Sequence, residues 1–196
     1  MPATERGRRT RAAIVSAAGQ LIYERGFAAT SLDDVLNACG AGKSQLYHYF
    51  GGKQELAAAV IDHQLRVILA NQPRLGHLES WEDFDAWAEE LLALHAGPRG
   101  PQACALGSLV GELDEDPVLH KEIKAAISVW ESHFTHGLTR LRDKGQLRSD
   151  ADPARLAAAL MAALQGGLML AHLRSDINPL HDALEMGLAH LRTHRA

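Results

Sequence analysis

Apolar residues recur at spacings of three and four along almost the whole chain, which is the pattern of helices with one buried face. Ile14, Ala18, Leu21 and Ile22 mark a first helix that Gly26 ends. The alternation of apolar and polar residues that marks strands is absent, and β-branched residues are sparse. The pattern therefore predicts an all-α protein.

Three later helices share one start signal, an Asp or Asn followed by proline, which suits the N-cap and the first helical position. These pairs are Asp116-Pro117, Asp152-Pro153 and Asn178-Pro179, and the helices that follow run to about Gly145, Leu168 and Leu191. Other apolar stripes predict helices over 53–71, 81–95 and 102–110, with a loop over 73–80 and a break over 97–101.

Residues 26–56 predict two short helices joined by a tight turn. Ser31 is a good N-cap, and Asp34 places a negative charge in the first turn. Gly40 ends that helix, because glycine readily adopts the left-handed conformation of a sharp turn. A second helix follows over 43–49. Its outward-facing residues are suited to base edges and phosphates in a major groove, and they are Lys43, Ser44, Gln45 and His48.

This segment, GFAATSLDDVLNACGAGKSQLYHYFGGKQEL, resembles the DNA-binding domain of the tetracycline-repressor (TetR) family. The resemblance covers about the first quarter of the chain. It implies a helix-turn-helix domain over 1–52 and a helical ligand-binding and dimerisation domain over 53–196. The matching positions are Gly26-Phe27, Thr30-Ser31, Val35, Ala38, Gly40, Lys43, Leu46-Tyr47, Tyr49-Phe50, Lys53 and Leu56.

The candidate DNA contacts fall into three groups. Side chains of the second short helix face bases or phosphates, and residues at helix starts lie where backbone N–H groups favour phosphate. Basic residues before the first helix form either an arm that reaches the DNA or a disordered basic tail. The set expected at the DNA is Arg6, Arg9, Thr30, Ser31, Lys43, Ser44, Gln45, Tyr47, His48, Tyr49 and Lys53.

Charge is divided unevenly along the chain, whose net charge is −4. Residues 1–53 hold seven basic and four acidic side chains, and the remainder holds 13 basic and 20 acidic ones. A basic module on an acidic body indicates that one end meets nucleic acid, with a double-stranded DNA operator as the expected partner.

Catalytic and metal chemistry find little support, so we expect no enzyme activity, no cofactor and no metal. Gly42-Lys43-Ser44 fails as a phosphate loop, because position 37, where the first glycine is required, holds Asn37. His190 and His194 have the i,i+4 spacing of metal ligands, but no carboxylate or thiol lies near them in sequence.

Two cysteines are too few for a disulfide framework, and no secretory signal is evident. We also find no uncharged apolar run long enough to cross a bilayer. A cytoplasmic protein without membrane contact is expected.

The resemblance implies a ligand pocket among the central helices, for a small apolar or electrophilic molecule. Ordinary core packing is the alternative for most of the large apolar residues there. The candidates, all expected to be interior, are Trp87, Leu91, Cys104, Leu106, Trp130, Phe134, Met161, Leu164 and Met169, with Leu94 beside them. Cys104 lies near a helix start, which lowers a thiol pKa, and is either a reactive sensor or an inert buried residue.

Small residues in the last two helices indicate a homodimer, because small side chains let helices approach closely. The expected interface comprises Ala159, Ala163, Gly166, Gly167, Leu184, Gly187, Leu188 and Leu191. Together these features predict a transcriptional regulator, a ligand-released repressor bound to an inverted-repeat operator. The alternative is a ligand-independent DNA-binding or architectural protein.

Overall fold

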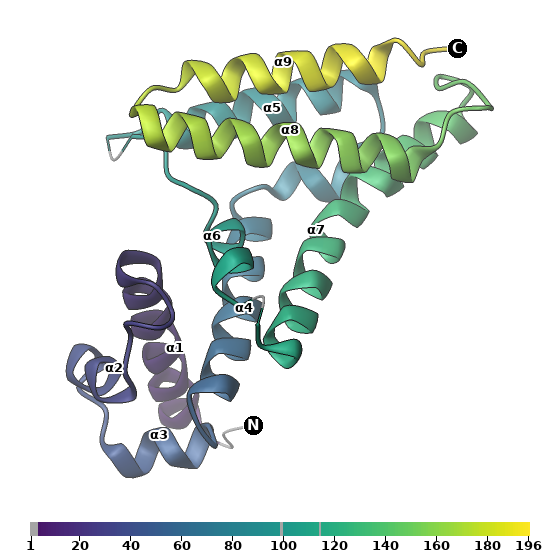
Figure 1. Ribbon diagram of the computed structural model, residues 1–196. Coiled ribbons are helices and arrows are strands. Elements are labelled where there is room, and N and C mark those ends of the chain that lie inside the picture. Colours follow the sequence, from purple (N-terminus) through teal and green to yellow (C-terminus); the bar gives the residue numbers. More distant parts are fainter. Residues whose placement is uncertain (1–3, 99, 114) are drawn as a thin grey trace. The chain divides into compact units, whose positions relative to one another are not determined.

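A computed structural model describes residues 4–98, 100–113 and 115–196, and every regular element in those ranges is helical (Figure 1). The predicted all-α fold is confirmed. One isolated antiparallel bridge, between Leu147 and Arg195, ties the chain after α7 to the C-terminal residues. The elements are α1 (Glu5–Arg25), α2 (Leu32–Cys39), α3 (Lys43–Tyr49), α4 (Lys53–Ala70), the 3₁₀ helix η1 (Pro73–His77), α5 (Trp81–His95), α6 (Ala105–Glu112), α7 (Pro117–Asp143), α8 (Pro153–Arg174) and α9 (Asn178–Arg192).

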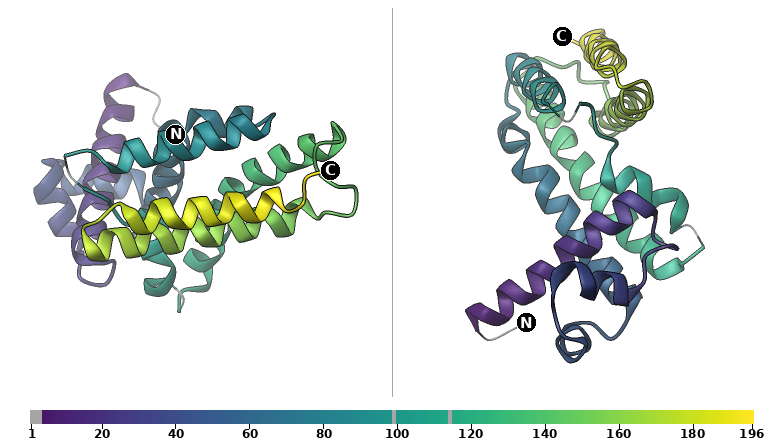
Figure 2. Two further views of the ribbon diagram at one scale, coloured as in Figure 1. Left: turned by 90° about the horizontal axis from the view of Figure 1, so that it is seen from above. Right: turned by 90° about the vertical axis from the view of Figure 1, so that its left-hand side faces the viewer.

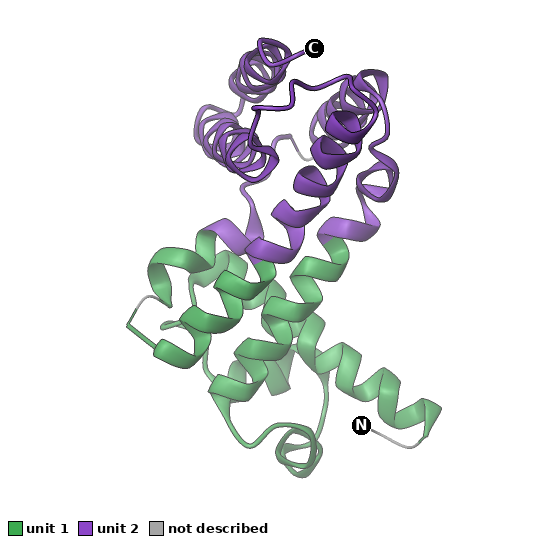
Figure 3. Ribbon diagram, turned by 90° about the vertical axis from the view of Figure 1, so that its right-hand side faces the viewer, with its two compact units in different colours: residues 1–67, 108–126 green, residues 68–107, 127–196 purple. Residues whose placement is uncertain are grey.

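The helices pack into two compact units (Figure 3). The first comprises residues 1–67 and 108–126, and the second comprises 68–107 and 127–196. Helices α4, α6 and α7 each contribute residues to both units. This division is one of packing, and the functional boundary between residues 52 and 53 stays a prediction.

The first unit is built around the buried face of α1. Ile14 and Ala18 are fully buried, and α1 contacts both α2 and α3, in which Val35 and Leu46 are buried. Phe50, the residue after α3, is also buried. This small core fixes α2 and α3 against α1, so the residues that remain on the surface of α3 have a defined direction.

In the second unit α8 and α9 lie side by side along their length (Figure 2). Two glycines permit this close approach. A Cβ atom at Gly167 would lie 2.9 Å from the Cβ of Ala183, and one at Gly187 would lie 3.0 Å from Cδ1 of Leu160. α5 contacts α9 as well, and Asp85 of α5 pairs with Arg192.

Buried polar groups in the second unit are partly satisfied. The indole N–H of Trp87 donates to the side-chain carbonyl of Gln72 at 3.0 Å, and both residues are buried. The rings of Trp87 and Phe134 meet edge to face at 4.8 Å. By contrast, the indole nitrogen of Trp130 is buried and has no hydrogen-bond partner among the described residues.

The expectation that no segment could span a membrane was wrong for α8. In length and composition it is apolar enough, because residues 156–173 contain no Asp, Glu, Lys or Arg. A core helix passes the same test, however, and Leu156, Leu160, Leu164 and Leu168 are buried within this chain. Packing within the chain therefore accounts for these four leucines, whereas Met169 and Leu173 of the same helix are exposed.

Candidate functional site

The helix-turn-helix begins with a reciprocal cap. The backbone N–H of Asp34 donates to Oγ of Ser31 at 3.1 Å, and the N–H of Ser31 donates to Oδ2 of Asp34 at 2.9 Å. The Ser31 hydroxyl also donates to Oδ2 of Asp34, and this bond, followed by the one from the Ser31 N–H, lowers the pKa of the Asp34 carboxyl. Gly40 ends α2 with φ of 66°, the left-handed conformation that the turn requires.

Helix α3 carries an exposed polar face above a single buried anchor. Leu46 is fully buried, whereas Lys43, Ser44, Gln45 and His48 are exposed, as their spacing suggested. Tyr47 is 51% exposed. Tyr49 is half-buried, and its ring meets the rings of His48 and Phe50.

Several of these side chains already have partners within the chain. Nζ of Lys43 lies 3.5 Å from Oδ1 of Asp33. Oε1 of Gln45 accepts the N–H of Gly42 at 2.9 Å, so Gln45 caps the start of α3, where Gly42 has no side chain to do so. Lys53 donates to the carbonyl of Ala28 at 3.3 Å. All three are surface contacts of the kind that contribute little stability, so a phosphate or base can replace them at small cost.

Thr30, which was expected at the DNA, is buried in this structure. Its side chain is 3% exposed, and its hydroxyl donates to the carbonyl of Gly26 at 2.9 Å. In this structure it therefore braces the loop before α2 and does not present a hydroxyl to DNA. Its neighbour Ser31 is exposed, although its hydroxyl also contacts Asp34.

The basic residues near the N-terminus are helical, since α1 starts at Glu5 with Thr4 as its N-cap. The alternative of a disordered basic tail is wrong for residues 6–11. Arg8 pairs with Glu5, and the guanidinium of Arg11 lies 5.1 Å from the ring centre of Phe50.

Arg6 and Arg9 differ from these two arginines, because their side chains have no hydrogen bond or ion pair within the described part of the chain. Both line a groove of about 360 Å³ between the first turns of α1 and the turn that joins α2 to α3. Gln45 lines the same groove. Two unpaired cations thus share a surface with the exposed face of α3, an arrangement suited to a DNA backbone.

These features define a helix-turn-helix DNA-binding regulator. Comparison with known proteins agrees: residues 14–60 match the family model "Bacterial regulatory proteins, tetR family", and residues 80–186 match "Tetracyclin repressor-like, C-terminal domain". The chain belongs to the TetR family of transcriptional regulators.

Curated relatives extend over nearly the whole chain. An uncharacterized HTH-type transcriptional regulator of Lactococcus lactis is 30% identical over 191 residues, or 91% of each protein. The transcriptional regulator AcuR of Cereibacter sphaeroides is 26% identical over 86% of this chain and 78% of its own length.

Solved structures share the fold. A TetR transcriptional regulator from Chloroflexus aurantiacus superposes with a TM-score of 0.80, 24% identity and 98% coverage of both chains. The reduced form of E. coli NemR superposes with a TM-score of 0.76 and 22% identity, covering 95% of this chain and 97% of that one.

Most of the residues expected to line the ligand pocket are buried, but some are not. Trp87, Leu91, Leu106, Trp130, Phe134, Met161 and Leu164 are buried, all within the second unit. Met169 and Leu94 were expected inside as well, which was wrong: they are 59% and 47% exposed. Met169 therefore lies on the solvent-exposed side of α8.

Cys104 lies at the start of α6, but its thiol is not activated. Burial raises its pKa, and this outweighs the hydrogen bonds from Gly107, Gln165 and Leu106 that act in the opposite direction. The N–H of Gly107 donates to Sγ at 3.3 Å, so Cys104 caps the helix. The expectation that the helix start lowers this pKa was wrong, because desolvation of the thiolate is the larger effect.

The expected dimer residues divide into two sets. Leu184, Gly187, Leu188 and Leu191 are buried in the single chain, as is Gly167, so they already serve contacts within the chain. Ala163 is half-buried and lies against the position where Gly187 would bear a Cβ. Only Ala159 and Gly166 remain available, and a Cβ at Gly166 would meet no atom within 4 Å among the described residues beyond the adjacent backbone of its own helix.

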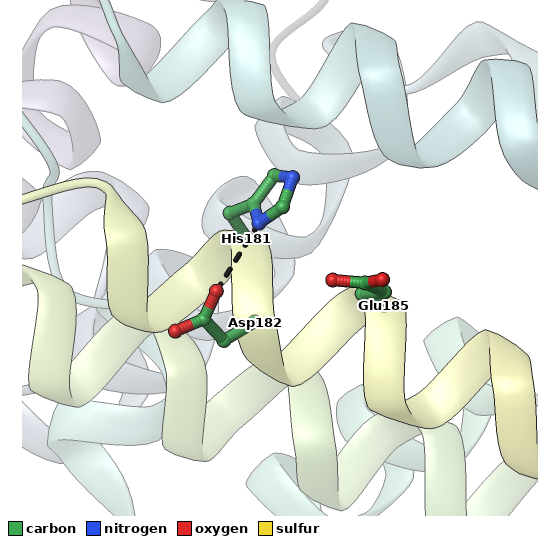
Figure 4. Close-up of side chains that lie close together, drawn as sticks. All are labelled: His181, Asp182 and Glu185. Carbon is green, nitrogen blue, oxygen red and sulfur yellow. Dashed lines mark hydrogen bonds and ion pairs between the residues drawn. The ribbon is translucent and has the colours of Figure 1, made fainter.

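Two side-chain groups bear on metal binding. His181, Asp182 and Glu185 place one possible ligand atom each within 4.8 Å of the others (Figure 4). All three are exposed, and they lie in the first turns of α9, where the helix dipole opposes a cation.

The second group lines a cleft of about 540 Å³ and includes His190 and His194. Asp150 and Asp152 line the same cleft. The fold thus brings carboxylates toward histidines that are isolated from them in sequence. Asp150 is paired with Arg148 and Asp152 caps α8, so both carboxylates are already engaged.

Proposed function

We propose that the protein is a homodimeric, ligand-released repressor that binds an inverted-repeat operator in double-stranded DNA. The observation that carries this proposal is the shared surface of α3 and α1, where Arg6 and Arg9 line one groove with Gln45. In this arrangement α3 enters a major groove and the two arginines neutralise phosphates beside it.

The proposed DNA contacts are the expected ones, with Thr30 omitted. Lys43 and Gln45 exchange their internal partners for base edges or phosphates, and His48 and Ser44 lie beside them on the exposed face. The two tyrosines, Ser31 and Lys53 are proposed as phosphate contacts. The proposed set is Arg6, Arg9, Ser31, Lys43, Ser44, Gln45, Tyr47, His48, Tyr49 and Lys53.

We propose the outer side of α8 and α9 as the dimer interface. Besides Ala159 and Gly166, it includes large apolar side chains that a single chain leaves in water. Met169, Leu173 and Met186 are 59%, 75% and 65% exposed. Exposed large apolar side chains of this kind mark protein contacts, and the small residues Gly166 and Ala159 would let a second pair of helices approach closely.

For the ligand we propose a small apolar molecule that binds among the buried residues of the second unit. Trp130 supports this, because its indole N–H is buried without an acceptor and a ligand oxygen or nitrogen would satisfy it. The raised pKa of Cys104 favours a non-reactive ligand over an electrophile. Ligand binding would select a conformation in which the two α3 helices no longer match successive major grooves.

Operator binding tests the proposal directly. A duplex selected by the wild-type protein from a random pool should contain an inverted repeat, and affinity should fall steeply with salt. Lys43→Ala and Gln45→Ala should each weaken specific binding by about 1–3 kcal/mol where the side chain reads a base. Full affinity in both folded variants would remove α3 from the interface. A screen in which no apolar molecule changes operator affinity would favour the ligand-independent alternative.

A further inference from the structure

The end of α6 contacts the loop between α1 and α2. The carboxylate of Glu112 accepts a hydrogen bond from the backbone N–H of Phe27, which lies 85 positions earlier in the sequence. Gly26 permits this approach, because a Cβ there would lie 2.9 Å from Oε2 of Glu112. Its φ of 87° also belongs to the region that favours glycine.

A second contact lies close by along the chain. The side-chain amide of Gln54, in the first turn of α4, donates to both carboxylate oxygens of Asp116 at 2.8 and 2.9 Å. Oδ1 of Asp116 also caps α7, because it accepts the N–H groups of Val118 and Leu119. Asp116 therefore joins the start of α7 to the start of α4.

Both contacts lie within the first compact unit, and together they bracket α2 and α3. Phe27 precedes α2, and Gln54 follows α3. Their partners, Glu112 and Asp116, are four positions apart, where α6 gives way to α7.

We propose that Glu112 and Asp116 are positioning residues that hold the α2–α3 module to the junction of α6 and α7. This inference rests on the proposed binding of DNA by α3, because the position of the module matters only if α3 binds a groove. Neither residue contacts DNA in this proposal. They act by restricting how far α3 moves, so that less conformational freedom is lost when both subunits engage the operator.

Two contacts are needed for this effect. A single exposed hydrogen bond to a carboxylate is weak, because water competes for both partners. When one contact is formed, it holds the partners of the other contact close together, so each contact raises the effective concentration for the other and strengthens it. The α1–α3 core is separately held by Ile14, Val35 and Leu46, so loss of the contacts should free the module without unfolding it.

The test uses the full-length dimer and the variants Glu112→Ala, Glu112→Gln, Gln54→Ala and the double variant Glu112→Ala/Gln54→Ala. Glu115→Ala is the matched control, because Glu115 is exposed and has no hydrogen bond or ion pair within the described part of the chain. Gln54 is chosen over Asp116 because its loss leaves the α7 cap intact.

Amide exchange at Phe27 and affinity for the selected operator duplex are the two measurements. We expect Glu112→Ala to speed exchange at Phe27 by about tenfold or more, with α1 protection unchanged. Operator affinity should fall about threefold in each Ala variant and about tenfold or more in the double variant. Glu112→Gln should restore slow exchange, since its amide oxygen can still accept the bond, and Glu115→Ala should behave as wild type.

Wild-type exchange and affinity in the double variant would overturn the inference. So would equal losses in Glu115→Ala, which would assign the effect to charge alone. A wild-type protein that selects no duplex would instead refute the proposed DNA binding. The exchange measurement needs no DNA, and it would still show whether the two contacts hold the module.

Discussion

In α3 the residues expected to meet another molecule face outward, whereas in α8 and α9 the expected contact residues are divided between the outside and the chain's own core. The α3 helix is seven residues long and buries one anchor, Leu46, so nearly every other side chain is available. The α8 helix has 22 residues and packs against α9 along one whole side. In a short helix with a single buried anchor, the remaining side chains face outward. In a long helix with small side chains, a small residue can serve either packing within the chain or contact with a second chain.

Gly166 and Gly167 show the division at adjacent positions. The added Cβ of a residue at 167 would lie 3.1 Å from the backbone of Leu180, whereas at 166 it would meet nothing within 4 Å. Small residues let helices approach closely, but sequence alone does not say whether the neighbouring helix belongs to the same chain. Here one glycine serves packing within the chain, and the next is proposed to serve the dimer.

The largest expected effect comes from breaking this packing. Gly167→Leu should lower the free energy of unfolding by about 3 kcal/mol, because its side chain meets backbone that cannot move aside. Gly166→Leu should cost less than Gly167→Leu, because it loses only the contribution of the dimer contact and leucine favours helix more than glycine does. Thermal unfolding compares the two variants.

The same pair sharpens the dimer proposal. Gly166→Leu should be a folded monomer by light scattering at micromolar concentration, because the added volume blocks a second helix pair. A Gly166→Leu protein that stays fully dimeric would place the interface elsewhere, and equal stability of the two variants would contradict the packing described for α8.

A smaller effect is expected at the DNA-binding end. Arg6→Gln should weaken operator binding by about 1 kcal/mol and reduce the slope of log affinity against log salt by about 0.9, the value for one lost phosphate contact. Arg8→Gln is the matched control, because Arg8 is already paired with Glu5. Equal salt slopes in both variants and wild type would remove the α1 groove from the DNA interface.

The fold could be predicted from sequence because its signals are local. Caps at Ser31, Asp116 and Asp152, the turn at Gly40 and the apolar stripes each fix a helix through neighbours within a few residues. The exposed face of α3 follows from the same local pattern, once Leu46 is recognised as its anchor.

Other features depend on residues far apart in sequence, which local patterns do not reveal. The contact between Glu112 and the N–H of Phe27 joins positions 85 apart. The pKa of Cys104 is raised because burial disfavours the thiolate, although its helix start alone favours the opposite shift. Local position thus predicted the wrong sign where tertiary burial was the larger effect.

Two buried tryptophans offer a further test within the second unit. Trp130→Phe loses side-chain volume but also removes a buried N–H that has no acceptor. These two effects oppose each other, so the free energy of unfolding should stay within about 1 kcal/mol of the wild-type value. Trp87→Phe should cost about 1–3 kcal/mol more, because it leaves the buried carbonyl of Gln72 without its donor. Urea unfolding measures both variants, and an equal cost would show that the Trp130 indole is satisfied in solution.

The smallest effect expected is a pH dependence of two matching helix caps, one in each unit. Asp34 of α2 and Asp83 of α5 both accept hydrogen bonds at the start of their helices, and in both the pKa is lowered. The cause differs, because Ser31 supplies the largest contribution at Asp34, whereas the backbone N–H of Glu79 does so at Asp83. Arg74 adds a charge 3.6 Å from Asp83.

A carboxylate whose pKa is lower in the folded state stabilises that state while it is ionised, and this stability is lost as pH falls below about 4 and the group becomes protonated. We therefore expect α2 and α5 to lose amide protection between neutral pH and pH 3, each at its first turn. Asp34→Asn should remove the pH dependence in α2 and leave it in α5, and Asp83→Asn should do the reverse. The loss of protection should be larger in α5 than in α2. The Asp83 carboxylate accepts the N–H groups of Glu79 and Ser80 and the hydroxyl of Ser80, and it also faces Arg74. A pH dependence that survives in both variants would mean that the caps are not its source.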